Sequence, residues 1–97
     1  MKSLRWTERA RDDLAAIHAF ISLDSPRYAP IVIANLLTAA ERLRDFPGSG
    51  RAVPEFANPS VREVIHTPYR IVYRLVSEDE VHILTIHHGA RRFPSSP

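Results

Sequence analysis

The hydrophobic pattern of this chain changes its period once, near the middle, and that change limits the folds it can adopt. Residues 8–44 repeat apolar side chains every three to four positions, a spacing typical of amphipathic helices. Residues 61–88 alternate polar and apolar side chains or run apolar in short segments, which is typical of strands. A chain of 97 residues has room for one core, so both halves must share it. The sequence therefore predicts a single α+β domain over 1–97, with 93–97 as a flexible tail.

The first half predicts a short strand at residues 2–6 followed by a helix. Thr7 is a suitable N-cap for this helix, and Glu8 favours its positive end. One face carries the apolar stripe, which consists of Ala10, Leu14, Ile17 and Ile21, with Phe20 beside it. We expect the opposite face to hold the polar residues Arg9, Asp12 and Asp13.

A second helix follows the break at Asp24-Ser25-Pro26. It starts either there, with Ser25 as its cap, or near Ala29, because Pro30 has no N–H to donate within a helix. Its apolar stripe consists of Ile33, Leu36, Leu37, Ala40 and Leu43, and the turn at 46–48 ends it. Two such helices joined by a short turn form an antiparallel hairpin.

The second half begins with a loop over residues 47–59, which contains three prolines and two glycines. Three strands are then expected, at 61–65, 69–76 and 81–88, separated by reversals at Thr67-Pro68 and at 77–80. The element order is β-α-α-β-β-β. It predicts a mainly antiparallel sheet with the helical hairpin packed on one face, the first strand at an edge, the last strand placed centrally, and the other face uncovered.

In the strand at 69–76, simple alternation divides the side chains between the two faces. One face takes Tyr69, Ile71, Tyr73 and Leu75, and the other takes Arg70, Val72, Arg74 and Val76. If Tyr73 lies in the core, its hydroxyl needs a hydrogen-bond partner.

Composition narrows the setting. The chain is 44% hydrophobic and 25% charged, which is ordinary for a soluble globular protein, and no apolar run approaches the ~20 residues that span a bilayer. Residues 1–6 are too short and polar for a signal peptide, so we expect a cytoplasmic protein with no membrane partner. The absence of cysteine excludes disulfides and thiolate metal sites.

Arginine is strongly preferred over lysine, by twelve residues to one. Its rigid, permanently charged fork suits bidentate contacts with phosphate or carboxylate. Codon bias alone explains such a preference equally well, so the position of each arginine matters more than their number.

The order of several short motifs resembles the RelE/ParE superfamily of toxins from bacterial type II toxin–antitoxin operons, over essentially the whole chain. The motifs are Ala10…Asp13-Leu14…Ile17, Leu43…Pro47…Gly50-Arg51…Val53-Pro54-Glu55, Arg62-Glu63, Tyr69-Arg70-Ile71-Val72-Tyr73, and His88-Gly89…Arg91. The ending His88-Gly89-Ala90-Arg91 is more similar to the ParE branch.

The resemblance implies a growth-inhibiting toxin that a cognate antitoxin neutralises, in a homo- or hetero-oligomeric assembly, as in plasmid stabilisation. The ParE branch binds and inhibits DNA gyrase and is not a nuclease, and this non-enzymatic role is the interpretation we favour. The alternatives are a RelE-like, ribosome-dependent mRNA endoribonuclease, whose partners are the ribosome and mRNA, and an inert, antitoxin-binding member of the family. No cofactor is implied.

Two sets of site residues follow from the resemblance. Nuclease chemistry would use Glu55, Arg70 and His88 as its catalytic residues. A binding toxin would contact its target through Arg51, Glu55, Arg62, Arg70 and Arg91. A structural role is the alternative: Glu55 pairs with Arg51 or Arg70 to fix the loop, and Arg70 packs on the neighbouring tyrosines. No metal site is expected, because His87 and His88 point to opposite faces of a strand.

Overall fold

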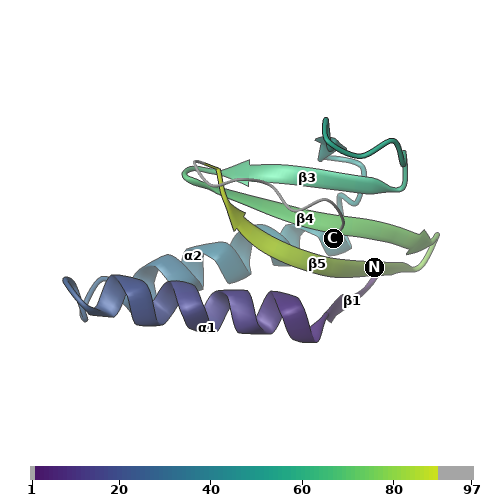
Figure 1. Ribbon diagram of the computed structural model, residues 1–97. Helices are drawn as coiled ribbons and strands as arrows, with labels where there is room; N and C mark the ends of the chain where they lie inside the picture. The colour runs from purple at the N-terminus through teal and green to yellow at the C-terminus, as the bar shows by residue number, and fades with distance from the viewer. Residues whose placement is uncertain (1, 90–97) are drawn as a thin grey trace.

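The computed structural model describes residues 2–89, and its element order matches the predicted fold (Figure 1). The first half contains strand β1 (Ser3–Trp6), helix α1 (Glu8–Ser22) and helix α2 (Ala29–Glu41), which continues as a 3₁₀ turn, Arg42–Arg44. The second half contains four strands: β2 (Arg51–Ala52), β3 (Val61–His66), β4 (Tyr69–Ser77) and β5 (Glu80–His88). The two-residue strand β2 lies inside the segment predicted as loop.

The five strands form one sheet in the order β1-β5-β4-β3-β2. Strand β1 runs parallel to β5, and the other neighbours are antiparallel. The predictions that β1 lies at an edge and that β5 lies inside the sheet are confirmed, although β4 is the middle strand. Thr67 and Pro68 make the predicted reversal between β3 and β4, with a cis peptide bond.

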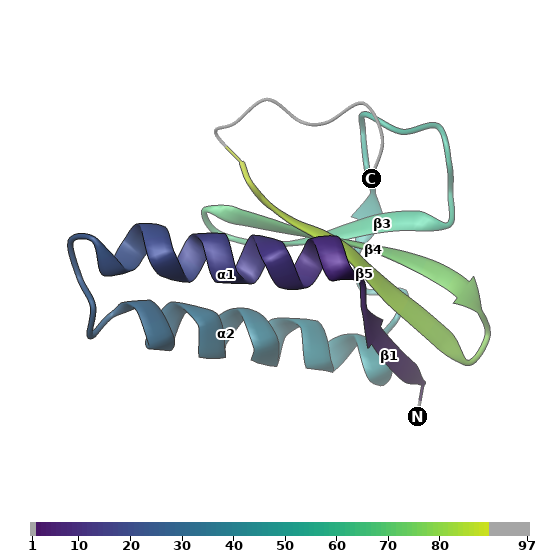
Figure 2. The same cartoon turned by 60° about the horizontal axis from the view of Figure 1, so that its bottom comes forward.

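Helices α1 and α2 lie side by side and antiparallel against one face of the sheet (Figure 2). The main core forms between them and that face. It includes Leu36 and Ala40 from α2, and Ile71, Tyr73 and Ile83 from the sheet, all fully buried. The predicted alternation of β4 is confirmed, because Tyr69, Ile71, Tyr73 and Leu75 belong to this core whereas Val72 does not.

The start of α1 follows the sequence prediction. The Thr7 hydroxyl accepts a hydrogen bond from the Ala10 amide at 3.1 Å and donates to the Ile83 carbonyl at 2.8 Å, so the cap also ties the helix to β5. Helix α2 begins at Ala29 rather than at Ser25, and Pro30 lies in its first turn, where a missing N–H costs nothing. The apolar stripes were wrong for Phe20 and Leu37, which remain exposed.

The helical pattern predicted Asp13 on the solvent side of α1, and this prediction is wrong. Its Oδ2 atom accepts hydrogen bonds from the Thr85 hydroxyl and, at 3.0 Å, from the Ile86 amide. Strand β1 pairs with β5 only as far as Ile83, so beyond that point the β5 edge needs another partner. Asp13 supplies it, and therefore fixes α1 to the sheet edge.

The face of the sheet away from the helices, here called the outer face, is not entirely uncovered. Val53 and Phe56 from the loop after β2 pack there against Val61, Val72 and Leu84. The predicted open surface is therefore restricted to the parts of this face that the loop leaves exposed. Within residues 2–89, no helix is both long enough and apolar enough to cross a membrane.

Candidate functional site

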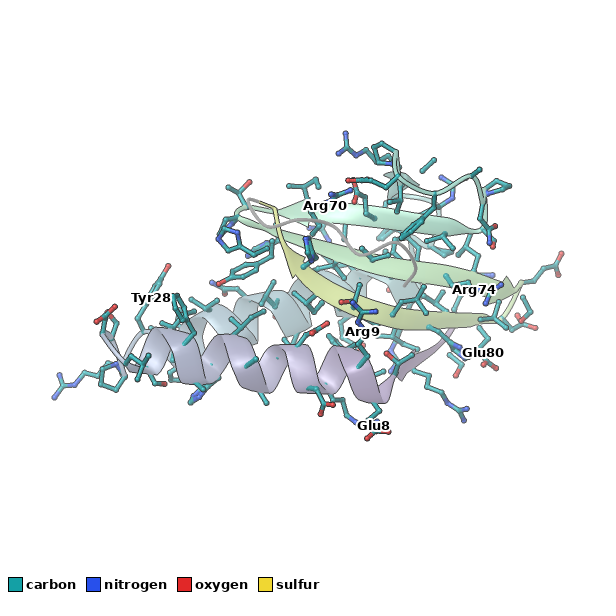
Figure 3. All side chains as sticks on the ribbon, viewed as in Figure 1. Glu8, Arg9, Tyr28, Arg70, Arg74 and Glu80 are labelled. Carbon is teal, nitrogen blue, oxygen red and sulfur yellow. The ribbon has the colours of Figure 1, made fainter. Side chains whose placement is uncertain are left out.

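Four charged side chains form a continuous ion-pair cluster on the outer face, and we call Arg51, Glu55, Glu63 and Arg70 the Arg–Glu cluster. Arg70 lies at its centre, on the upper part of the sheet in Figure 3. Its Nε donates to Oε1 of Glu63 at 2.6 Å, and its Nη1 and Nη2 donate to the two oxygens of Glu55 at 2.9 and 2.8 Å. The second oxygen of Glu63 accepts from Nε of Arg51 at 2.8 Å.

Strand register explains why these residues meet. Glu63 of β3 lies opposite Arg51 of β2 on one side and opposite Val72 of β4 on the other. Arg70 is two positions before Val72, so its side chain emerges on the same face. Glu55 comes from the loop, which Val53 and Phe56 hold down on that face.

Glu63 is the unusual member of the cluster, because its carboxylate is completely buried, with 0% of the side chain exposed. A buried charge is tolerated only when it is paired and hydrogen-bonded, and here each carboxylate oxygen has its own guanidinium. Hydrogen bonding to Arg70 also lowers the pKa of Glu55, and the two glutamates raise the pKa of Arg70. The cluster joins two guanidinium groups to two carboxyl groups, so the formal charges of its side chains cancel.

The arrangement confirms one structural alternative and rejects the other. Glu55 does pair with Arg70 and fixes the loop, as that alternative required. Arg70 does not pack on Tyr69 or Tyr73, since those rings lie in the core beneath the opposite face of β4.

The two histidines at the end of β5 point to opposite faces, as alternation predicted, but His88 is not beside Arg70. His88 lies opposite Tyr69 and meets its ring edge-on, with centroids 5.6 Å apart, on the helix-facing side. His87 is the residue opposite Arg70. Of the hypothetical catalytic residues Glu55, Arg70 and His88, the structure therefore brings together only Glu55 and Arg70.

Arg62 is separated from the cluster as well. It lies opposite Tyr73, on the helix-facing side of β3, and its Nη1 donates to the Gly50 carbonyl at 2.9 Å. Its Nε is buried without a hydrogen-bond partner among the described residues. Arg62 thus supports the backbone just before Arg51. Arg91, the remaining predicted target contact, lies outside the described residues.

Tyr73 positions the same segment from beneath, and its hydroxyl has the partners that a core tyrosine needs. It donates to the Pro47 carbonyl at 2.7 Å and accepts from the Gly50 amide at 3.0 Å. A Cβ on Gly50 would stand 2.5 Å from that hydroxyl and 2.6 Å from the Glu63 carbonyl oxygen. Only glycine fits there, so the approach of β2 to β3, which brings Arg51 to Glu63, depends on Gly50.

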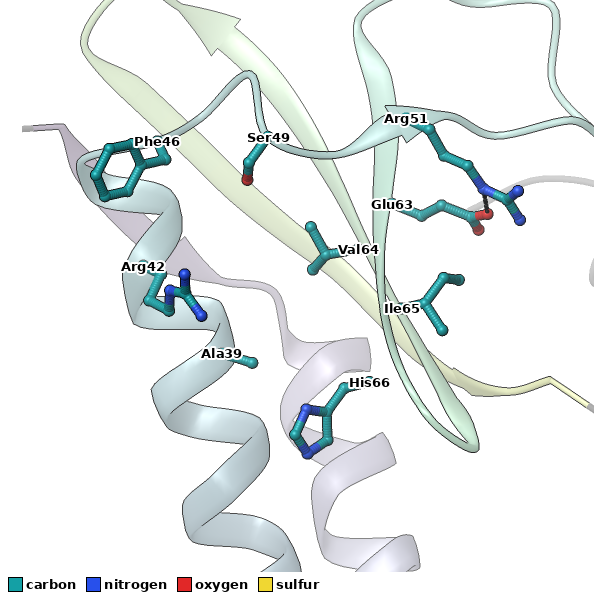
Figure 4. A pocket seen from close by; sticks show the side chains of 9 residues that line it. All are labelled: Ala39, Arg42, Phe46, Ser49, Arg51, Glu63, Val64, Ile65 and His66. Carbon is teal, nitrogen blue, oxygen red and sulfur yellow. Dashed lines mark hydrogen bonds and ion pairs between the residues drawn. The ribbon is translucent and has the colours of Figure 1, made fainter.

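A groove of about 630 Å³ runs beside the cluster, between α2 and the edge of β3 (Figure 4). Arg51 and Glu63 form one end of it, as the dashed contact in the figure shows. Its other lining residues come from α2 and the turn after it, from the loop, and from β3: Ala39, Arg42, Phe46, Ser49, Val64, Ile65 and His66.

Sequence reasoning missed Glu63 as a member of the site and missed this groove. The available signal for Glu63 was a carboxylate at an alternate position of an apolar strand, next to Arg62 in a motif already noted. Its burial depends on partners seven and twelve residues away, which only the strand register brings together.

Comparison with known proteins agrees with this architecture. A family model described as the ParE toxin of the type II toxin–antitoxin system parDE matches residues 4–93. Toxin RelE2 of Caulobacter vibrioides is 36% identical over 91 residues, which cover 94% of this chain and 99% of that protein.

Two solved structures share the fold. A chain of the chromosomal ParDE system of P. aeruginosa superposes with a TM-score of 0.75 at 28% identity, covering 91% of this chain and 96% of that one. A chain of the toxin–antitoxin complex RelBE2 of Mycobacterium tuberculosis gives a TM-score of 0.68 at 23% identity, covering 90% of this chain and 96% of that one. At this identity the similarity concerns the fold alone. With the family model matching nearly the whole sequence, this chain belongs to the ParE/RelE superfamily and is a toxin of the ParE family of type II toxin–antitoxin systems.

Proposed function

We propose that this toxin is ParE-like in its action: it inhibits DNA gyrase by binding, without cleaving RNA, and a cognate antitoxin neutralises it. The Arg–Glu cluster is the observation that supports the proposal most directly. RNA cleavage requires an acid, a base and a cation that meet at one phosphate. Here all three nitrogens of Arg70 donate to carboxylates, and His88 lies across the sheet from them.

The target-binding surface in this proposal is the part of the outer face around the cluster. Arg51 is the most accessible cation of the cluster, with 63% of the side chain exposed, and 41% of the Glu55 side chain is exposed as well. Paired charges of this kind are suited to recognising a protein surface with alternating charge, because they set register and orientation. Arg62 contributes from below, by supporting Gly50, and Arg91 remains a prediction from the sequence.

An apolar surface at the far end of the helical hairpin favours a protein partner as well. Four large side chains there are exposed: Phe20, Leu23, Tyr28 and Ile31. Exposed apolar side chains gathered in one region commonly mark interaction sites. The ParDE system of P. aeruginosa, by its description, pairs a toxin of this fold with an antitoxin, so we assign this surface to antitoxin binding in a hetero-oligomeric complex.

A RelE-like endoribonuclease is the second candidate, favoured by the contact between Glu55 and Arg70 and by the position of His87. His87 lies opposite Arg70 on the outer face, so a base, a cation and an acid would come from Glu55, Arg70 and His87. An inert member of the family is the third candidate, and it would leave growth unchanged when expressed without its antitoxin.

Toxin induction with two parallel readouts tests the proposal. Plasmid supercoiling reports gyrase inhibition, and mapping of transcript ends reports RNA cleavage. We expect loss of supercoiling with intact transcripts, and purified toxin should inhibit purified gyrase. Transcripts cut at defined codons, with supercoiling unchanged, would replace this proposal by the endoribonuclease.

A pair of variants connects the activity to the cluster. Arg51→Ala should weaken gyrase inhibition, whereas Arg74→Ala, an exposed arginine on the same face but outside the cluster, should not. Circular dichroism of both variants checks that each remains folded. Equal loss of inhibition in the two variants would mean that the face acts only through its net charge.

A further inference from the structure

Strand β1 lies at the end of the sheet, and in the described part of the chain no strand pairs with its outer side (Figure 2). Ser3 and Thr7 donate their amides to carbonyl groups on the β5 side, at 2.7 and 3.1 Å. Because backbone groups alternate along a strand, Lys2, Leu4 and Trp6 direct theirs to the outer side. Such an edge can pair with another extended chain, including a second copy of itself.

Arginine residues hold both ends of this outer edge. Nη1 of Arg11, which belongs to α1, donates to the Trp6 carbonyl at 3.1 Å. Nη1 of Arg44, in the turn after α2, donates to the Lys2 carbonyl at 3.2 Å, and the Arg44 carbonyl accepts from the Lys2 amide at 3.1 Å. The outer edge of residues 2–6 therefore offers another strand only the backbone groups of Leu4 and the amide of Trp6.

Apolar side chains along the same edge would favour its pairing. A second groove, also of about 630 Å³, follows β1, and its apolar lining comes from Leu4, Trp6, Leu14 and Leu37. Leu37 is 43% exposed, although it belongs to the predicted apolar stripe of α2. A second copy placed against this edge would cover these side chains, so the hydrophobic effect acts in favour of self-association.

A closed dimer has two-fold symmetry, so the β1 edges of two copies would pair antiparallel. In the register centred on Arg5, Leu4 of each copy pairs with Trp6 of the other through four backbone hydrogen bonds in total. Arg11 already occupies the Trp6 carbonyl, which two of these bonds need. The two Arg5 residues would also lie directly opposite each other, with Cα atoms about 4.5 Å apart, where like charges repel.

The neighbouring register, centred on Leu4, meets a different obstacle. It would pair Lys2 of each copy with Trp6 of the other. Arg44 holds both backbone groups of Lys2, and Arg11 holds the Trp6 carbonyl. Each register therefore lacks the backbone groups that it requires.

We infer that Arg5, Arg11 and Arg44 prevent the toxin from pairing with a second copy of itself through β1. Arg11 and Arg44 occupy the backbone groups of the edge, and Arg5 adds repulsion in the one register that Arg44 does not block. Natural sheets protect their edges with charged side chains in a similar way. The inference rests on β1 alone and holds whichever molecule the toxin inhibits.

Exchange of the charge at residue 5 tests the inference. Arg11→Ala frees the Trp6 carbonyl but leaves two Arg5 residues facing each other, so this variant should remain monomeric. The double variant Arg5→Glu/Arg11→Ala should also remain monomeric, because two carboxylates would face each other. An equimolar mixture of the two brings opposite charges together and should form a mixed dimer. Sedimentation velocity measures the association, and hydrogen exchange should slow at the Leu4 and Trp6 amides in the mixture alone.

The matched control is a mixture of the unmodified protein with Arg5→Glu. It offers the same opposite charges at residue 5 but retains Arg11 in both copies. We expect its association to be weaker by about tenfold or more, because two backbone hydrogen bonds remain blocked. Arg11 is exposed, so its replacement should leave the fold intact, and circular dichroism of each variant checks this.

Three results would overturn the inference. If the mixture without Arg11 stays monomeric at millimolar concentration, these arginines are not what keeps the edge free. If the control mixture dimerises equally well, Arg11 does not close the edge. If dimers form while the Leu4 and Trp6 amides still exchange rapidly, the copies meet through another surface.

Discussion

Replacing Glu63 by glutamine is the most informative perturbation of this protein, because it removes one charge and almost no volume. The change leaves Arg70 facing an amide in place of a buried carboxylate, and only 12% of the Arg70 side chain is exposed. Loss of one partner from a buried ion pair costs about 3–5 kcal/mol of stability. Arg51 is 63% exposed, so solvent screens its interaction with Glu63, and we take the loss of that interaction to cost below about 1 kcal/mol of stability.

We therefore expect Glu63→Gln to lower the free energy of unfolding by about 3 kcal/mol. For a domain of this size, 1 kcal/mol corresponds to about 4–8 °C, so the melting temperature should fall by about 12–24 °C. Urea and thermal unfolding followed by circular dichroism measure both quantities. Glu41→Gln is the matched control, since it breaks a solvent-exposed pair with Arg44 and should have no measurable effect.

The same experiment distinguishes a buried ion pair from a merely polar contact. A loss below about 1 kcal/mol for Glu63→Gln would refute the reasoning, since that is the value typical of surface pairs. Combining it with Arg70→Met should cost less than the sum of the single changes, because the second change removes the guanidinium that the first leaves unpaired. Strict additivity would contradict a direct interaction.

Three further predictions concern the residues that hold the site in place. Gly50→Ala should strongly destabilise the protein, because its Cβ would overlap the Tyr73 hydroxyl and a backbone carbonyl. Gly48→Ala should be tolerated, because nothing lies within 4 Å of its Cβ, and thermal unfolding compares the two variants. Asp13→Ala should cost about 1–3 kcal/mol and speed hydrogen exchange at the β5 edge, whereas the exposed Asp12→Ala should not, as mass spectrometry would show. Burial raises the pKa of Tyr73, so folding favours its protonated form. The resulting stabilisation is complete below the ordinary tyrosine pKa near 10 and is lost as pH rises through the pKa of the folded protein. Tyr73→Phe should remove this alkaline dependence of stability, as urea unfolding at several pH values would show.

Most of the fold could be predicted because hydrophobic period and local capping determine it. The stripe on α1 and the Thr7 cap came directly from residue spacing, and so did the two faces of β4. The errors share a cause, which is that they depend on contacts distant in sequence. Asp13 accepts from a strand 73 residues away, a need that arises only because β1 stops short of the end of β5.

The site was predicted less completely, because the pairing of the strands decides which of its side chains meet. Alternation showed that His87 and His88 face opposite ways but not which of them shares a face with Arg70. The pairing of β4 with β5 decides this, because it places Arg70 opposite His87 and Tyr69 opposite His88. Without the strand pairing, neither histidine could be assigned, and the choice of His88 was wrong in its placement.

The cluster also explains why twelve arginines do not make this a phosphate-binding surface by themselves. On the outer face, Glu55 and Glu63 neutralise Arg70 and hold Arg51 at one end of the groove. An anionic polymer would have to displace a buried carboxylate before it could bind Arg70, and the uncompensated Glu63 would then oppose binding. A protein partner faces no such barrier, because it can contact the exposed end of Arg51 and leave the pairs intact. The geometry thus supports the proposal that this surface recognises a protein rather than cleaving a nucleic acid, and the supporting feature is one buried carboxylate, that of Glu63.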